Sequence, residues 1–227
     1  MMGYNELEKF LSKERLSKYL ILANDNKEEA IKLYELNLKY SANLYVVLSC
    51  FETVLRNLIN REMIKYSSNW ILNLSVIDNK IMNNLGKMKQ LNANTITYYK
   101  EFFKEQEKLI KEADNSLKKD RKNIDNNYLI SRLNFGFWTR MFNKYYETEL
   151  WNKYLYKIFK KSIKRGYIEA KLNELRRLRN RIAHNECVLN LKHKPINYYD
   201  FIIELLSNTS TNITNWIEKQ MSRDLFK

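Results

Sequence analysis

The residues best suited to chemistry lie in the run Arg179-Asn180-Arg181-Ile182-Ala183-His184, which holds one of the chain's two histidines. Histidine has a reference pKa of about 6.5, so it can take up and release a proton near neutral pH. An arginine guanidinium keeps its charge and grips two phosphate oxygens at once. Asn180 lies four residues before His184, on the same face of a helix. These are the groups that RNA cleavage without a metal ion requires.

In such a reaction the 2′-hydroxyl of RNA attacks the neighbouring phosphorus. We expect His184 to act as general acid and base, Arg179 to clamp the phosphate, and Asn180 to orient the imidazole. One histidine cannot be base and acid in the same step, and the other histidine, His193, lies outside the motif. A second copy would supply another His184 and Arg179, so the mechanism favours a symmetric homodimer with one composite cleft.

Arginine five places before histidine is a modest signal, because this spacing also arises by chance. A histidine at a helix end, hydrogen-bonded to backbone, would show the same pattern. The sequence has no helical pair of His and Glu ligands and no clustered Asp-x-Asp or Cys/His set, so we expect neither a metal nor a cofactor. It also has no Gly-rich phosphate loop and no Gly-x-Ser-x-Gly elbow.

Positive charge is concentrated just before this motif. The segment 153–181 holds eleven basic and two acidic residues, which is nine of the fourteen net positive charges. Such a run is either a solvated helix face or a track for phosphates, and its place beside the motif favours the track. The residues that we assign to RNA binding are Lys157, Lys160, Lys161, Lys164, Arg176, Arg177 and Arg181.

The elements that must position the motif are predicted to be helices. One proline and four glycines in 227 residues are too few for a protein rich in turns, so we expect a single all-α domain over 1–227. The expected helices are 5–23, which would bury Phe10 and Ile21, then 27–66, 95–122, 197–207 and 211–222. We expect a break at 24–26 and a less regular segment over 70–94. The apolar cluster 129–138 is predicted to be core or subunit interface.

The long helix predicted over 27–66 also carries a polar group. Its buried face is marked by Leu44, Leu48, Phe51, Leu55 and Leu58. Glu52 and Arg56 stand four residues apart in that stretch and are followed by Asn57. The local pattern favours a surface ion pair over the second interpretation, in which these residues face the histidine.

The longest apolar run, 45–51, is too short to span a bilayer, and the first residues do not resemble a signal peptide. The two cysteines lack the spacing of a metal or redox motif. We therefore expect a cytoplasmic protein with RNA as partner and no membrane.

The motif from Arg179 to His184 resembles the R-x4-6-H motif of HEPN ribonucleases. Four further stretches resemble the Abi-like (abortive infection, AbiD/AbiF-type) branch of that superfamily, over about residues 7–190. They are Leu11-Ser12-x-x-Arg15-Leu16-x-x-Tyr19-Leu20, Ala30-Ile31-x-Leu33-Tyr34-x-x-Asn37, Phe51-Glu52-x-Val54-Leu55-Arg56-Asn57, and Leu133-x-Phe135-Gly136-Phe137-Trp138 with Leu150-Trp151.

This resemblance implies a HEPN-type helical bundle with additional helices, a homodimer, and metal-independent endoribonuclease activity used as a phage-defence toxin. It also implies likeness to the HEPN halves of type VI CRISPR effectors, and some Abi-like members are restrained by a small RNA antitoxin. By this likeness Glu52, Arg56 and Asn57 become candidates for a second polar element of the site. The alternatives are a non-catalytic RNA-binding module that holds a regulatory small RNA, and a helical scaffold with an incidental motif.

Overall fold

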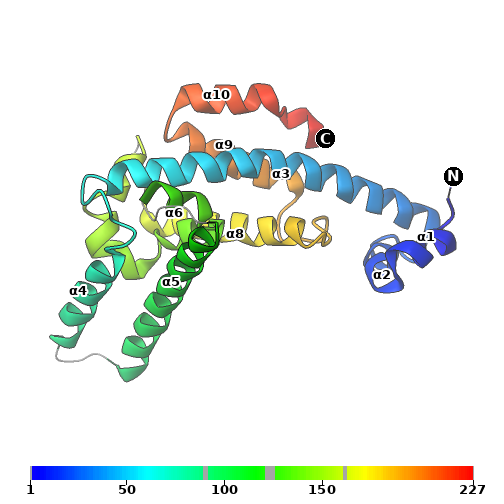
Figure 1. Ribbon diagram of the computed structural model, residues 1–227. Helices are drawn as coiled ribbons and strands as arrows, with labels where there is room; N and C mark the ends of the chain where they lie inside the picture. Colours follow the sequence, from blue (N-terminus) through cyan, green and yellow to red (C-terminus); the bar gives the residue numbers. More distant parts are fainter. Residues whose placement is uncertain (1, 89–91, 121–125, 161–162, 227) are drawn as a thin grey trace. The chain divides into compact units, whose positions relative to one another are not determined.

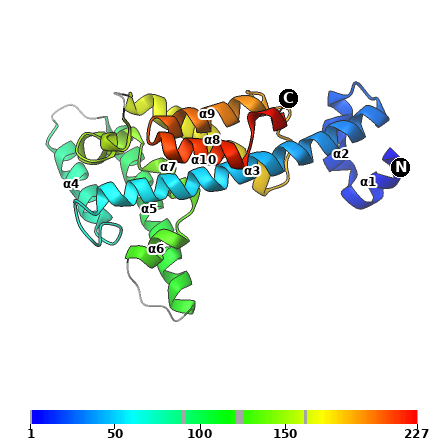
Figure 2. The same ribbon diagram turned by 90° about the horizontal axis from the view of Figure 1, so that it is seen from above.

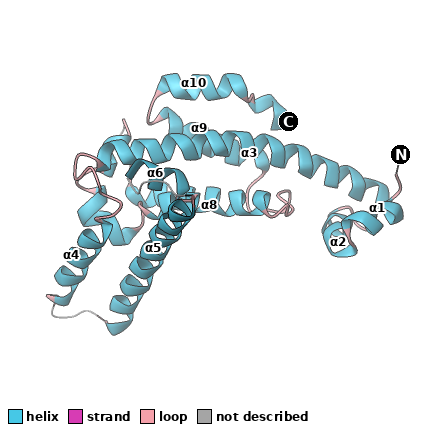
Figure 3. Cartoon of the chain, in the orientation of Figure 1, coloured by secondary structure: helices cyan, strands magenta, loops and turns pink. Residues whose placement is uncertain are grey.

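The computed structural model describes residues 2–88, 92–120, 126–160 and 163–226, and within these ranges it contains helices and no strands (Figure 3). The predicted all-α class is therefore confirmed. The chain divides into two compact units, each described by itself. The first unit is Met1–Phe51 with Glu174–Lys227, and the second is Glu52–Asn173. The expectation of a single domain stays a prediction.

The order of the helices can be followed by colour in Figure 1. The elements are α1 (Tyr4–Leu11), α2 (Lys13–Leu22), α3 (Lys27–Met63), α4 (Leu74–Gly86), α5 (Ala93–Lys119), α6 (Asn126–Arg132), α7 (Phe135–Arg140), η1 (Lys144–Tyr146), η2 (Glu147–Trp151), η3 (Leu155–Ile158), α8 (Arg165–Ala183), α9 (Pro195–Ser207), α10 (Thr211–Gln220) and η4 (Arg223–Phe226). The predicted helices over 27–66, 95–122, 197–207 and 211–222 are confirmed as α3, α5, α9 and α10, with small shifts at their ends.

In the first unit, the predicted single helix over 5–23 is wrong. The chain breaks at Ser12, whose φ of 73° and ψ of 152° cannot continue a helix, so α1 and α2 meet at a corner. The Ser12 hydroxyl then accepts a hydrogen bond from the Arg15 backbone N–H at 3.4 Å. Because helical periodicity does not carry across the corner, Phe10 and Ile21 are not buried as predicted but are 75% and 73% exposed.

The predicted break at 24–26 is confirmed. Asn24 and Asp25 adopt left-handed backbone angles, with φ of 49° and 63°, which asparagine and aspartate tolerate better than most residues. The Asn26 side-chain oxygen accepts hydrogen bonds from the N–H groups of Glu28 and Glu29, both at 3.1 Å. These bonds cap the start of α3.

A small core ties α1, α2 and the start of α3 to the segment that follows α8. Its buried members are Tyr4, Leu16, Tyr19, Ala23, Ala30 and Cys187. In the same unit α9 and α10 lie side by side (Figures 1 and 2). There the Tyr199 hydroxyl donates to the Met221 carbonyl at 3.0 Å, and Phe226 stacks on Tyr40.

In the second unit, α4 and α5 pack against each other (Figure 1). The expectation of an irregular segment over 70–94 is wrong, because α4 is a helix that buries Ile77, Ile81 and Leu85. Its asparagines are weak helix formers, so packing rather than propensity supports it. The aromatic patch is core as predicted, since Phe137 and Trp138 are fully buried against Trp70.

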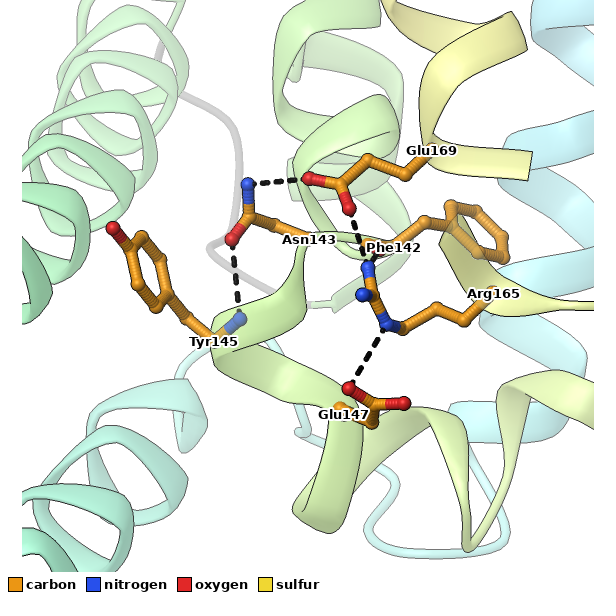
Figure 4. Close-up of polar contacts among 6 residues, drawn as sticks. All are labelled: Phe142, Asn143, Tyr145, Glu147, Arg165 and Glu169. Carbon is orange, nitrogen blue, oxygen red and sulfur yellow. Dashed lines mark hydrogen bonds and ion pairs between the residues drawn. The ribbon is translucent and has the colours of Figure 1, made fainter. Parts of the chain in front are cut away.

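The first turn of α8 is anchored within the second unit by one arginine (Figure 4). The Arg165 Nη1 donates to the Phe142 carbonyl at 2.9 Å and pairs with Glu169, and its Nε lies 3.4 Å from a Glu147 oxygen. Asn143 Nδ2 donates to Glu169 at 2.8 Å and extends the network. One cation of the basic run is therefore neutralised by two carboxylates and serves to hold the helix.

Among the residues that the structure describes, α3 is the one helix whose length and composition would let it cross a membrane. The core helix of a soluble protein passes the same test, and α3 buries residues such as Leu44 and Ile59 inside the fold. The expectation that the protein has no membrane partner stays a prediction.

Candidate functional site

His184 directly follows Ala183, the last residue of α8, and it is exposed. Its backbone N–H still bonds to the Asn180 carbonyl at 3.0 Å. Asn185 then turns left-handed with φ of 53°, its N–H bonds to the Ile182 carbonyl at 3.0 Å, and the Glu186 N–H bonds to the Arg181 carbonyl at 2.8 Å. This pair of bonds is a Schellman motif. It sets the direction of the chain at His184.

The turn after His184 is also held from two other helices of the first unit. The Arg15 Nη1 of α2 donates to the Asn185 carbonyl at 2.6 Å. The side-chain oxygen of Asn37 on α3, which is 2% exposed, accepts the buried Val188 N–H at 2.7 Å. His184 is therefore an exposed imidazole on a segment whose backbone is bonded on both sides of the turn.

Arg181 has a structural role in the same turn. Its Nη1 donates to the Cys187 carbonyl at 3.1 Å and to the Asn190 side-chain oxygen at 3.4 Å, and its Nε lies 3.8 Å from a Glu186 carboxylate oxygen. These contacts join the last turn of α8 to the loop that follows it. The assignment of Arg181 to RNA binding stays a prediction, with part of its donor capacity already engaged.

Arg179 is half-buried, and its guanidinium has no hydrogen-bond or ion-pair partner among the described residues. Such a cation can bind an added anion without first breaking an internal pair. Asn180 is exposed, and across the described ranges no hydrogen bond joins its amide to the imidazole of His184. The proposed orienting role of Asn180 therefore stays a prediction.

A pocket of about 230 Å³ opens directly beside His184. One wall is the turn from His184 to Cys187, and the other is formed by α2 and the Ser12 corner. Tyr19 and Cys187 are buried at 1% and 2% exposure, so they form its floor. Burial, and next the neighbouring Cys187, raise the pKa of Tyr19 well above its ordinary value, so its hydroxyl stays protonated at any physiological pH.

The other predicted RNA-binding residues fall in different parts of the chain. Arg176 is half-buried and Arg177 is exposed on α8 in the first unit, where Arg177 Nη1 lies 3.4 Å from Glu174. Lys157, Lys160 and Lys164 are exposed in the second unit, around η3 and before α8 rather than along one helix face. Lys161 lies outside the described residues.

The suggested second polar element lies on the part of α3 that belongs to the second unit. Glu52 and Arg56 are half-buried and Asn57 is exposed. The Arg56 Nε is buried and makes no hydrogen bond within the described part of the chain. Leaving such a buried N–H donor without a hydrogen bond costs stability. The assignment of these residues to the site stays a prediction.

Sequence reasoning did not identify Arg15, Lys18 and Asn37, which support or line the His184 turn. Arg15 and Asn37 stand inside the two N-terminal stretches that carry the family resemblance, at positions that are neither apolar nor part of the motif. Among the residues that carry the resemblance in these stretches, most are apolar, so the polar Arg15 and Asn37 are the signal that could have identified them. In the residues described, no group of three or more His, Cys, Asp or Glu side chains could hold a metal ion.

One of three comparisons with known proteins gives a match. The family model described as Abi-like protein matches residues 2–190. No curated protein and no solved structure matches the chain. Membership of this family suggests a role in abortive infection and phage defence, and it is consistent with nuclease activity. The match covers more than half of the sequence and includes the motif together with the α2 and α3 residues that contact the turn after it. The chain therefore belongs to the Abi-like protein family.

Proposed function

We propose that this protein is a HEPN-type, metal-independent endoribonuclease that acts as the toxin of an abortive-infection or toxin–antitoxin system. The observation that carries the proposal is that His184 is exposed on a bonded turn and that Arg179, five residues before it, is a half-buried guanidinium without a partner among the described residues. The net charge of +14 supports a polyanionic partner. Membership of the Abi-like family supports the role in defence.

The proposed reaction is a transesterification within the RNA. The 2′-oxygen forms a bond to the adjacent phosphorus while the bond to the 5′-oxygen of the next nucleotide breaks. One imidazole takes the proton from the 2′-hydroxyl, and a second imidazole gives a proton to the departing 5′-oxygen. Arg179 holds the phosphate oxygens as negative charge builds on them. The products carry 2′,3′-cyclic phosphate and 5′-hydroxyl ends.

The second imidazole comes from a homodimer in this proposal, so that His184 and the partner subunit's His184 share one cleft. Mixing wild-type chains with His184→Ala chains at a fixed total concentration tests this arrangement. A mixed dimer holds one His184, so activity should fall with the square of the wild-type fraction if the cleft needs both imidazoles. Activity that falls only in proportion to the wild-type fraction means that each chain works alone. Full activity from a strictly monomeric protein would refute the dimer, and His193 would then be the first residue to test as second acid.

Growth of cells that express the protein separates the proposal from its alternatives. Wild-type protein should arrest growth, and His184→Ala should not. A protein that co-purifies with a defined small RNA but cuts no RNA would instead be the non-catalytic module that holds a regulatory RNA. A protein that neither arrests growth nor carries RNA would have an incidental motif.

The basic run before α8 is proposed to contact phosphates through Lys157, Lys160, Lys161 and Lys164. Changing all four to Gln should weaken RNA binding and reduce the slope of log affinity against log salt by about 3, because fewer counterions are released. A matched control removes the same charge from α5 at Lys100, Lys104, Lys108 and Lys119, which are exposed on a helix that also carries acidic residues. If both quadruple variants show equal slopes, the run is a solvated face.

A further inference from the structure

We propose that the pocket between α2 and the His184 turn is a subsite for the sugar-phosphate next to the cleaved bond, with Lys18 and Arg15 as its phosphate contacts. The inference rests on the proposed ribonuclease function, and it adds a binding surface that the catalytic motif does not contain. It follows from the position, size and charges of the pocket, which lies wholly within the first unit.

The position of the pocket restricts what it can hold. His184 is one of its lining residues, so a ligand in the pocket lies against the group proposed to move protons. The volume of the pocket is about 230 Å³. This is more room than a lone phosphate needs and less than most pockets for drug-sized molecules offer. One sugar-phosphate unit of an RNA strand suits the space.

The charges that face the pocket favour an anion. Its four charged residues besides His184 are Glu14, Arg15, Lys18 and Glu186. Both carboxylates are already engaged. Hydrogen bonds from its own backbone N–H, and then from Ser12, lower the pKa of Glu14, and Glu186 lies 3.8 Å from the Arg181 guanidinium. These contacts partly balance the negative charge of the two carboxylates, which reduces their repulsion of an anion in the pocket.

The two cations that line the pocket, Lys18 and Arg15, still have N–H donors available for a ligand. Lys18 is exposed and has no hydrogen-bond or ion-pair partner in the portions of the chain that are described. Arg15 uses one of its five guanidinium N–H donors to bind the Asn185 carbonyl at 2.6 Å, and its other donors remain for a phosphate. Arg15 is therefore both a positioning residue for the His184 turn and a binding group, whereas Lys18 serves binding alone.

Lys18 is accordingly the residue to change, because its loss cannot disturb the turn. Lys18→Gln should raise KM for a short single-stranded RNA about tenfold while kcat stays within about twofold, since the contact is made equally in the bound and transition states. In a His184→Ala background, the same change should reduce the salt slope of RNA binding by about one. Lys13→Gln is the matched control, because Lys13 is an exposed lysine of the same helix that does not line the pocket.

The outcomes separate the subsite from the catalytic proposal. If wild type cuts RNA but Lys18→Gln and Lys13→Gln have the same KM and salt slope, the subsite is wrong and the ribonuclease stands. If wild type binds RNA without cutting it and only Lys18→Gln reduces the slope, the subsite stands and catalysis is wrong. If the protein neither cuts nor binds the RNA, both are wrong. A melting temperature unchanged in both variants confirms that they are folded.

Discussion

Asn37 offers a direct test of how the segment after the motif is held. Its side-chain oxygen accepts the Val188 N–H at 2.7 Å, and the two residues are 2% and 0% exposed. Asn37→Ala removes the acceptor and leaves a buried backbone N–H without a partner. The cost of such a group is about 1–3 kcal/mol, with a smaller addition for the space left behind. We expect the first unit to lose about 2–3 kcal/mol of stability.

Amide hydrogen exchange of Val188 measures this effect at the bond itself. If local opening governs exchange, a loss of about 2–3 kcal/mol accelerates it roughly 30- to 150-fold. Because Val188 follows His184 by four residues, the looser segment should also lower kcat for RNA cleavage. Tight substrate binding by the basic surfaces should leave KM less affected.

Asn43→Ala is the matched control for this variant. Asn43 is also an asparagine on α3 but is only half-buried, and its amide donates to the Leu225 carbonyl at 3.4 Å, which is near the limit for a hydrogen bond. We expect it to cost less than about 1 kcal/mol and to leave Val188 exchange unchanged. Equal stability losses in the two variants, with slow Val188 exchange in both, would refute the reasoning that Asn37 anchors the segment.

Three further predictions concern other residues. Ser12→Gly should raise the melting temperature by about 2–4 °C, because φ of 73° with ψ of 152° strains any residue except glycine. A melting temperature below that of wild type would mean that the lost hydroxyl cap matters more than the strain. Burial raises the pKa of Asp78 to about 7, against the hydrogen bond from Tyr146. Between about pH 4 and 7 the folded protein therefore binds more protons than the unfolded chain, so the free energy of unfolding falls as pH rises, by up to about 4 kcal/mol in total. Asp78→Asn should remove this pH dependence from the melting temperature. Arg56→Ala should abolish RNA cleavage with little change in melting temperature, and retained cleavage with lower stability would make Arg56 a structural residue.

The regular helices could be predicted because their apolar residues recur at helical spacing. Leu44, Leu48, Phe51 and Leu55 are all at most 3% exposed on α3, as that spacing requires. The corner at Ser12 could not be predicted, because serine there adopts backbone angles that are nearly restricted to glycine. Serine is a favoured N-cap residue, but it also occurs inside helices and in loops, so Ser12 alone does not locate the corner.

The candidate site was predictable in its chemistry but not in its support. His184 stood out because histidine is scarce and follows an arginine at a suitable spacing. Arg15 and Asn37 reach the same turn from 170 and 151 residues away, through contacts to backbone atoms of Asn185 and Val188. A backbone carbonyl or N–H is present in nearly every residue type, so the sequence alone does not indicate that Arg15 contacts Asn185 or that Asn37 contacts Val188. The pocket beside His184 exists only once these distant segments meet.

RNA cleavage in the presence of EDTA tests the central proposal most directly. Purified wild-type protein and His184→Ala should be incubated with a single-stranded RNA, and the ends of the products should be determined. The proposal predicts that wild type cuts at full rate in EDTA, that its products end in 2′,3′-cyclic phosphate, and that His184→Ala is inactive although it folds and binds RNA. Cleavage that stops in EDTA, or that leaves 3′-hydroxyl ends, or that persists in His184→Ala, would contradict it.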